Sequence, residues 1–300
     1  MENSHPHKTV LLKEAVDALA LTGSSVVVDA TGGAGGHSER ILETLTKEGV
    51  LIVIDSDPHA IEHIKHRIGD NAAKIHFRCG NFRAIDRIVT ELGIEKVDAV
   101  LADLGWNSAQ FETGEKGFSF LRDEPLLMTY GESSAYSFTA KDIVNEWREE
   151  AIADLIYAYA DEHFARRIAK KIVETRKVKP LETTRDLIAC VLEAVPKKFH
   201  HGRIHPATKT FQALRIAVND ELDAVTELIE GSLNILQTHG RLSIITFHSI
   251  EDRIVKNTFK DNAEKGRGIV LTKKPIIATQ EELKENPRAR SAKLRIFETL

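Results

Sequence analysis

A glycine-rich loop is the first segment of this sequence whose residue types suggest chemistry. It runs from Asp29 to Ser38 and follows a short run of valines. Glycines let the backbone turn sharply and let a ligand come close, and ligands of α/β proteins bind beyond the carboxyl ends of such strands. Asp55 ends the next apolar run, where its carboxylate can accept hydrogen bonds from both hydroxyls of a ribose. Although a glycine loop alone also fits a simple tight turn, the loop and the acid together predict a site for an adenosine-containing cofactor.

The residues around this loop separate two such cofactors. NAD sites favour a third glycine where the helix begins, facing the pyrophosphate, but His37 and Ser38 stand there. Asp29 lies beneath the loop, where a carboxylate suits a ligand with a cationic amino-acid tail better than a pyrophosphate. Phe82 follows the third predicted strand and is either a flank for an adenine ring or a core aromatic. These features favour S-adenosylmethionine, with an NAD-dependent oxidoreductase as the alternative.

A second cluster follows the fourth predicted strand, where Asp103 and Trp106 have an acid-x-x-aromatic spacing. The exocyclic amine of cytosine or adenine is a poor nucleophile because its lone pair is delocalised into the ring. An acid that accepts a hydrogen bond from this N–H aims the lone pair, and an aromatic ring alongside stacks on the base for about 1–3 kcal/mol. The candidate catalytic residues are therefore Asp103, Trp106 and the adjacent Asn107. In the alternative interpretation, Asp103 only holds the loop or the cofactor and Trp106 only packs.

The elements that position these residues alternate between strand and helix. Apolar runs rich in β-branched residues predict buried strands at 26–29, 51–55, 75–79 and 97–103. Helical spacing predicts helices between them, at 37–47, 58–68 and 85–92. Strands alternating with single helices predict a parallel sheet covered on both faces.

This alternation is interrupted and then returns. After a loop-like stretch at 106–136, helical patterns cover 142–177, 183–195 and 207–236, with a basic loop at 196–206. Strands are again predicted at 240–247 and 293–298, and Ser249–Asp252 is typical of a capping box that opens a helix to about residue 262. The predicted fold class is α/β: a core of residues 1–107 and 213–300, with a mostly helical domain inserted at 108–212.

The basic residues are concentrated in this insert. Residues 164–215 carry 13 Lys and Arg against four Asp and Glu, in a chain whose net charge is −4. A basic block in an otherwise acidic chain is typical of a polyanion site, although a solvated helix face would have the same composition. The candidates for contacts to a nucleic-acid backbone are Arg166, Arg167, Lys197, Lys198, Arg203 and Lys209.

Composition excludes several other classes of protein. Hydrophobic residues make up 42% and charged residues 29%, which is ordinary for a soluble globular chain. The two cysteines, Cys79 and Cys190, are too few for a disulfide framework or a structural zinc site, and no metal site is indicated. No apolar run approaches the roughly 20 residues of a membrane span, and the first residues resemble neither a secretion nor an import signal. We expect a cytoplasmic protein with reduced thiols.

Nine stretches along nearly the whole sequence resemble one family, the bacterial 16S rRNA (cytosine-N4) methyltransferases of the RsmH (MraW) family. The stretches are HKTVLL (7–12), DATGGAGGHS (29–38), IDSDP (54–58), GNFR (80–83), GFSF (117–120), EHFARRI (162–168), IHPATKTFQALRIAVNDEL (204–222), TFHSIEDRIVK (246–256) and NPRARSAKLR (286–295). The stretches at 204–222 and 246–256 are highly specific because generic methyltransferases lack them. The family usually has proline where this chain has Thr9, and it usually differs at 106–110 and 121–130.

This resemblance implies a function and a set of site residues. It implies a Rossmann-like S-adenosylmethionine-dependent sheet, a helical insert that recognises rRNA, and methylation of a decoding-centre cytosine at N4 in the small subunit or its precursor. The implied cofactor-binding residues are Gly35, Gly36, His37, Asp55, Phe82, Asp103 and Gln110. An alternative from another class is a ribosome-assembly factor that binds rRNA with weak or no activity. The sequence leaves the choice between a monomer and a homodimer open.

Overall fold

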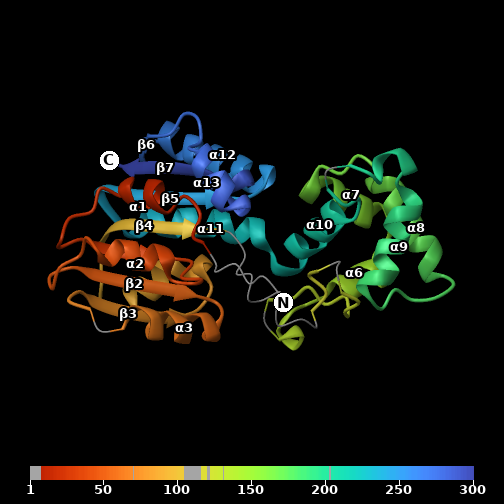
Figure 1. The fold of residues 1–300 in the computed structure, drawn as a ribbon, viewed down its shortest axis with the longest axis horizontal. Coiled ribbons are helices and arrows are strands. Elements are labelled where there is room, and N and C mark those ends of the chain that lie inside the picture. Colours follow the sequence, from red (N-terminus) through yellow and green to blue (C-terminus); the bar gives the residue numbers. More distant parts are fainter. Residues whose placement is uncertain (1–7, 70, 105–115, 120–121, 131, 203) are drawn as a thin grey trace. The chain divides into compact units, whose positions relative to one another are not determined.

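The computed structural model describes residues 8–69, 71–104, 116–119, 122–130, 132–202 and 204–300. The chain divides into two compact units, one formed by Met1–Trp106 with Leu222–Leu300 and the other by Asn107–Glu221 (Figure 1). The first unit contains the sheet and the second is mostly helical. Within the described residues, no helix combines the length and the apolarity that crossing a membrane requires.

The first unit is built on a seven-stranded sheet with the strand order β3-β2-β1-β4-β5-β7-β6. Its strands are β1 (Val26–Asp29), β2 (Val50–Asp55), β3 (Lys74–Cys79), β4 (Val97–Asp103), β5 (Leu236–Thr246), β6 (Gly268–Val270) and β7 (Lys293–Thr299). Strands β1 to β5 pair in parallel, whereas β7 is antiparallel to both of its neighbours. The order reverses between β1 and β4, which is the switch point where α/β sheets bind ligands. The predicted fold class, an α/β Rossmann-like sheet with a mostly helical insertion after β4, is confirmed.

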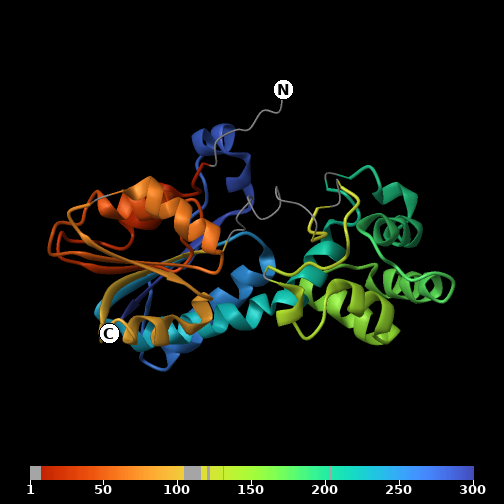
Figure 2. The ribbon, with the colours of Figure 1, turned by 90° about the horizontal axis from the view of Figure 1, so that it is seen from below.

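Helices cover both faces of this sheet (Figures 1 and 2). They are α1 (Leu12–Asp17), α2 (Gly36–Leu42), α3 (Pro58–Ile68), α4 (Ile85–Thr90), α11 (Glu221–Ile235), α12 (Ser249–Glu264) and α13 (Gln280–Glu285). Successive strand residues belong to opposite cores: Val27 packs with α1, α2 and α3, and Val28 packs with α4, α11 and α12. Because both faces are buried, the strands are apolar at nearly every position, which is why the sequence predicted them well.

The second unit is a helical unit with its own apolar core. Its helices are α6 (Ala140–Glu146), α7 (Glu149–Ala160), α8 (Ala165–Arg176), α9 (Thr184–Ala194) and α10 (Thr208–Asn219), and short 3₁₀ turns lie at Ser133–Ala135 and Lys197–Phe199. Helix α7 packs against both α8 and α10, and α8 packs against α9. Its amphipathic helices therefore bury one face each and leave the other face polar.

Two sequence predictions about helices were wrong in detail. The pattern at 142–177 is three helices, because Trp147 and Arg148 are extended and Asp161 is left-handed (φ 47°, ψ 42°). The pattern at 207–236 is two helices, because Asp220 is left-handed (φ 50°, ψ 43°). Two of these helices, α7 and α10, end at a left-handed Asp, a residue that is easily passed over in an apolar repeat because Asp tolerates this conformation better than most residues.

Two predicted boundaries also lie elsewhere. The N-cap of helix α12 lies one residue earlier than predicted: it is His248 and not Ser249, and the capping box pairs it with Glu251. Helix α10 runs without a break across residues 212 and 213, where the sequence placed the end of the insert, and the helical unit extends to Glu221. Because α10 is one continuous helix that packs against α7, the boundary between the two units does not fall in its middle.

Candidate active site

The glycine loop joins β1 to α2 through two left-handed residues. Gly33 has φ 53° and Gly35 has φ 85°, conformations that favour glycine. Neighbouring glycines are required by close packing: a Cβ at Gly32 would lie 2.6 Å from Ile64 Cδ1, and a Cβ at Gly36 would lie 1.9 Å from Thr9 Oγ1. Among the described residues, a Cβ at Gly33 would meet only the Thr31 carbonyl oxygen, at 3.7 Å. The loop is therefore packed on both ends and open at Gly33.

Asp55, at the end of β2, braces this loop. One carboxylate oxygen accepts a hydrogen bond from the Gly33 N–H at 2.7 Å, and the other accepts one from the Asp57 N–H at 2.8 Å. Burial raises the pKa of Asp55 above its ordinary value, against the opposing effect of these N–H groups. Each carboxylate oxygen keeps a second lone pair for a ligand hydroxyl. The structure thus brings Asp55 and the loop together, where the carboxylate braces the loop and keeps lone pairs that a ligand could use.

Asp29, at the end of β1, is fully buried beneath the loop. Its carboxylate accepts hydrogen bonds from Ser38 Oγ at 2.6 Å and from the Thr31 N–H at 3.2 Å. Burial raises the pKa of Asp29 to about 6, and the nearby charge of Asp55 adds to the rise, while its two hydrogen bonds oppose it. At neutral pH most molecules therefore carry a negative charge directly under the loop.

Asp103, at the end of β4, completes a row of three carboxylates. Its backbone N–H donates to Thr31 Oγ1 at 2.6 Å, which ties β4 to the loop. His37, from the first turn of α2, is buried, and its Nδ1 lies 3.9 Å from Asp103 Oδ2. Because β2, β1 and β4 are adjacent in the sheet, Asp55, Asp29 and Asp103 line one edge. The structure brings together the predicted cofactor residues Gly35, Gly36, His37, Asp55 and Asp103 at this edge.

Phe82 lies one strand farther along the same edge. It begins a 3₁₀ turn (Phe82–Ala84) after β3, and the Gly80 N–H donates to the Asp55 carbonyl oxygen at 2.9 Å. Its half-buried ring also packs against the core that contains α4 and α11. The two interpretations from the sequence, adenine flank and core aromatic, are thus both compatible with its position.

Four predicted site residues lie outside the described residues: Trp106, Asn107, Gln110 and Arg203. Their roles stay predictions.

The other predicted backbone contacts lie on the helical unit. Arg166 and Arg167 are exposed on α8, Lys197 and Lys198 are on the 3₁₀ turn that follows α9, and Lys209 is on α10. Lys209 Nζ donates to the Asp161 carbonyl oxygen at 2.8 Å, so it also caps the end of α7. Several basic residues outside the predicted set are paired with carboxylates: Lys170, Lys171, Lys179 and Arg185.

Sequence reasoning missed an aromatic pair among these cations. The rings of Phe164 and Phe199 lie 5.2 Å apart, and Phe199 is 47% exposed. The Arg167 guanidinium lies 5.9 Å from the Phe164 ring centre, and Lys198 Nζ lies 5.1 Å from that of Phe199. The signal was present in the sequence as an aromatic residue directly after two lysines. Exposed aromatic rings among cations are what single-stranded nucleic-acid sites offer to bases.

The NDEL stretch, by contrast, holds the helical unit together. Arg215, only 2% exposed, forms an ion pair with Glu221 at 2.8 Å, and Glu221 also accepts a hydrogen bond from the Tyr130 hydroxyl at 2.6 Å. Asn219 Nδ2 donates to the Met128 carbonyl oxygen at 2.7 Å and Asn219 Oδ1 accepts from the Tyr130 N–H at 3.0 Å. These contacts fasten the segment around Met128 to the end of α10.

Comparisons with known proteins were made for the whole chain. Residues 4–300 match the MraW methylase family. The ribosomal RNA small subunit methyltransferase H of Brevibacillus brevis is 43% identical over 312 residues, covering 99% of each chain. The ribosomal RNA small subunit methyltransferase H of Clostridioides difficile is 40% identical over 309 residues, covering 98% of this chain and 99% of the relative. A crystal structure of an rRNA methylase from Streptococcus thermophilus aligns with a TM-score of 0.46 and 13% identity, covering 98% of this chain and 99% of the other.

Proposed function

Because this chain belongs to the MraW methylase family, we propose that it transfers a methyl group from S-adenosylmethionine to small-subunit ribosomal RNA. The two relatives at 43% and 40% identity carry that activity in their names and match along almost their full length. Within that RNA, we assign the exocyclic N4 of a decoding-centre cytosine, presented in the small subunit or its precursor. We expect this reaction to take place in the cytoplasm. The mass of the free protein in solution would distinguish a monomer from a homodimer.

The observation that carries the choice of cofactor is the row of three carboxylates around an open glycine loop. Asp29, Asp55 and Asp103 end three adjacent strands, and the loop is open at Gly33. S-adenosylmethionine carries a sulfonium and an ammonium group, which these carboxylates attract, whereas the pyrophosphate of NAD would meet three like charges. The residues present therefore fit S-adenosylmethionine and disfavour the NAD-dependent alternative.

Each carboxylate has a distinct part in holding the cofactor. We assign Asp55 to the ribose hydroxyls, because both of its oxygens lie at the loop. Asp29 supplies negative charge from beneath the loop, and Gly35, Gly36 and His37 form the turn above it. Phe82 and Gln110 complete the predicted set. When bound, the cofactor supplies an electrophilic methyl group beside the end of β4.

Asp103 is our candidate for activating the target amine. Its carboxylate is 19% exposed at the end of β4, where it can accept a hydrogen bond from the N4–H of cytosine. That contact would turn the nitrogen lone pair out of the ring plane, and the carboxylate could take up the proton that N4 releases when it is methylated. Buried His37, 3.9 Å away, limits how the carboxylate can rotate. Trp106 and Asn107 are assigned to stacking and alignment, and correct alignment can contribute about 7–11 kcal/mol.

The helical unit is assigned to the RNA strand that flanks the target. A stacked cytosine hides its N4, so the base must be unpaired or swung out of its helix to be methylated. The basic set on α8 and the 3₁₀ turn at Lys197–Phe199 would hold the phosphates, and Phe199 would stack on a neighbouring base. This assignment is supported by the contrast with Lys170, Lys171, Lys179 and Arg185, whose charges are already paired within the protein.

The decisive experiment measures the modified nucleoside. Purified protein is incubated with methyl-labelled S-adenosylmethionine and small subunits from cells that lack this protein, and the digested rRNA is analysed by mass spectrometry. We expect label in N4-methylcytidine at one position. Label on another atom would contradict the N4 assignment. RNA binding without methyl transfer would instead support the assembly-factor alternative.

A second experiment tests RNA contact by the helical unit. The variant replaces Lys197, Lys198 and Arg203 with alanine, and we measure its rRNA affinity as a function of salt concentration. We expect the slope of log affinity against log salt concentration to be smaller by roughly three, one for each phosphate that loses its cation. Phe199→Ala should weaken binding by about 1–3 kcal/mol at an unchanged slope. The matched control replaces three basic residues that form ion pairs with carboxylates of the protein: Lys170, Lys179 and Arg185. Equal slopes for the two triple variants would move RNA recognition elsewhere on the chain.

A further inference from the structure

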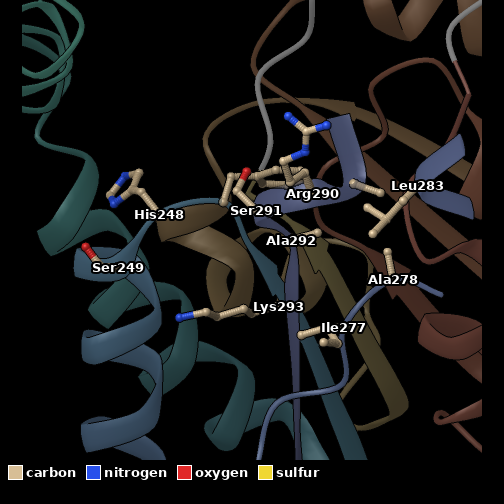
Figure 3. Close-up of a pocket in the computed structure, with 11 residues that line it drawn as sticks. His248, Ser249, Ile277, Ala278, Leu283, Arg290, Ser291, Ala292 and Lys293 are labelled. Carbon is tan, nitrogen blue, oxygen red and sulfur yellow. The ribbon is translucent and has the colours of Figure 1, made fainter. Parts of the chain in front are cut away.

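A pocket in the α/β unit is lined by residues that do not belong to the glycine loop (Figure 3). Its volume is about 270 Å³, and it is formed between the start of α12 and the segment that leads into β7. Two of the family-specific stretches, FHS at 247–249 and ARSAK at 289–293, supply most of its lining. The assignment of cofactor and catalytic residues does not use them.

The lining has an apolar side and a cationic side. Ile277, Ala278 and Leu283 form one side in Figure 3, and His248, Ser291 and Arg290 are drawn on the other. Ile277 is 64% exposed, so its side chain is accessible to a ligand at the pocket. No described residue in the lining is a carboxylate, so the charged side chains there are basic or histidine.

The two cations of the lining differ in their partners. Lys293 Nζ donates to Asp252 Oδ2 at 2.9 Å, and Arg295 Nε donates to the other oxygen of the same carboxylate at 2.6 Å. Arg290 is exposed on the 3₁₀ turn Pro287–Ser291, and within the described residues it has no hydrogen-bond or ion-pair partner. Its guanidinium is therefore available to an anion from outside the protein.

The pocket opens at the same edge of the sheet as Asp103. Asp103 pairs with Ile245 of β5, and the Leu104 N–H donates to the Ile245 carbonyl oxygen at 3.0 Å. Phe247, two residues after Ile245, lines the pocket, and Lys293 of β7 pairs with Thr246 at the same level. Adjacent strands lie about 4.8 Å apart, so the pocket is roughly 5–10 Å along the edge from Asp103. That distance suits a neighbour of the methylated nucleotide.

We propose that this pocket binds a nucleotide of single-stranded RNA next to the target cytosine. The base lies against Ile277 and Leu283, and Arg290 binds the phosphate. The volume is below the range of about 300–1,000 Å³ typical of sites for drug-sized ligands, so it suits one base and not a second whole cofactor. An apolar wall with an unpaired guanidinium beside it suits a nucleotide, because the wall offers apolar contact to the base and the guanidinium binds the phosphate. This inference rests on the proposed function, since it needs an RNA substrate.

Two variants test the two halves of the pocket separately. Arg290→Ala removes the cation that binds the phosphate, and Ser291→Trp fills the pocket without changing the charge. Ser291 is exposed and has no hydrogen-bond partner among the described residues, so both substitutions leave the fold's internal contacts intact. The control is Arg288→Ala, which removes the same side chain from the same 3₁₀ turn at a position outside the lining.

We measure binding of each variant to a single-stranded RNA that spans the target, as a function of salt, and methyl transfer to small subunits. Arg290→Ala should weaken binding roughly tenfold and lower the salt slope by about one. Ser291→Trp should weaken it about tenfold or more at an unchanged slope. Affinity for S-adenosylmethionine should stay at the parent value in all three. If both pocket variants bind RNA like Arg288→Ala, the pocket is not an RNA subsite.

A photocrosslink separates failure of this inference from failure of the proposed function. RNAs with 4-thiouridine placed before or after the target cytosine are irradiated with the parent protein, and crosslinked peptides are sequenced. We expect one of the two positions to crosslink within residues 277–293. Normal methyl transfer with crosslinks only elsewhere would overturn the pocket and leave the function standing. Absence of methyl transfer by the parent protein would overturn the proposed function itself.

Discussion

Replacing Asp29 with asparagine should make the protein more stable at neutral pH while weakening its cofactor site. Asp29 is fully buried, and burial raises its pKa from the ordinary 3.8 to about 6. Asparagine can keep both contacts, because its Oδ1 can accept from the Thr31 N–H, as one Asp29 oxygen does at 3.2 Å, and its Nδ2 can donate to Ser38 Oγ, which lies 2.6 Å from the other oxygen. The substitution therefore removes chiefly the cost of a buried charge.

The sign and size of this effect follow from linkage between proton binding and folding. Below pH 3.8, Asp29 is protonated in both the folded and the unfolded chain, so it does not penalise folding. Between pH 3.8 and about 6 the unfolded chain loses this proton while the folded chain keeps it, so folding stability falls as the pH rises. A shift of this size corresponds to roughly 2–3 kcal/mol in the free energy of unfolding, lost between about pH 4 and pH 7.5.

The assay is urea unfolding of the parent and Asp29→Asn from pH 4 to pH 7.5. The contributions of the other titrating groups cancel in the difference between the two free energies of unfolding. That difference, in favour of the variant, should therefore grow by about 2–3 kcal/mol over this range. Asp223→Asn, at an exposed position of α11, is the control for the loss of a carboxylate at the surface. A flat difference for Asp29→Asn would refute the argument that Asp29 carries a buried charge. Calorimetry on the same variant should show weaker binding of the cationic cofactor.

Three further predictions concern single residues. Asp55→Ala should weaken S-adenosylmethionine binding by about ten- to a hundredfold, the loss of roughly 1.5–3 kcal/mol of charge-assisted hydrogen bonding; unchanged affinity in calorimetry would remove the ribose assignment. Asp103→Ala should lose turnover that saturating S-adenosylmethionine does not restore, and full recovery at saturation in a methyl-transfer assay would limit Asp103 to cofactor binding. Arg215→Ala leaves Glu221 without its buried guanidinium partner and should destabilise the helical unit by about 3–5 kcal/mol, measured by urea unfolding; a change below about 1 kcal/mol would contradict a structural role for this pair.

The fold class could be predicted from the sequence because its signals are local and repeated. Strands buried on both faces are apolar at almost every position, as at Val50–Asp55, and each is followed by a helical repeat. The glycine loop was also visible, because left-handed residues such as Gly33 and Gly35 require a particular residue type. The specific stretches then identified the family without any coordinates.

The helix breaks could not be predicted in the same way. Asp161 and Asp220 are each left-handed inside an apolar repeat; the break after α7 covers residues 161–164, and the break between α10 and α11 is Asp220 alone. The residue type at these two breaks does not reveal the left-handed conformation, whereas the glycines of the loop do. At the second break, the hydrogen bonds of Asn219 to the segment around Met128 hold the chain in place, and they join residues far apart in the sequence. Such long-range contacts decide where a helix ends.

By itself, then, the sequence determined the α/β architecture, the loop and the candidate carboxylates, because residue type and spacing encode local conformation. Only the tertiary structure decided the pKa values and the charge partners of those groups. Asp29 has a raised pKa because strands and helices bury it, and Asp103 faces His37 because β4 lies beside β1. Likewise, Lys171 is neutralised by Glu193 whereas Arg290 has no such partner among the described residues. Burial and charge pairing depend on which distant segments meet, and local sequence patterns carry no record of that.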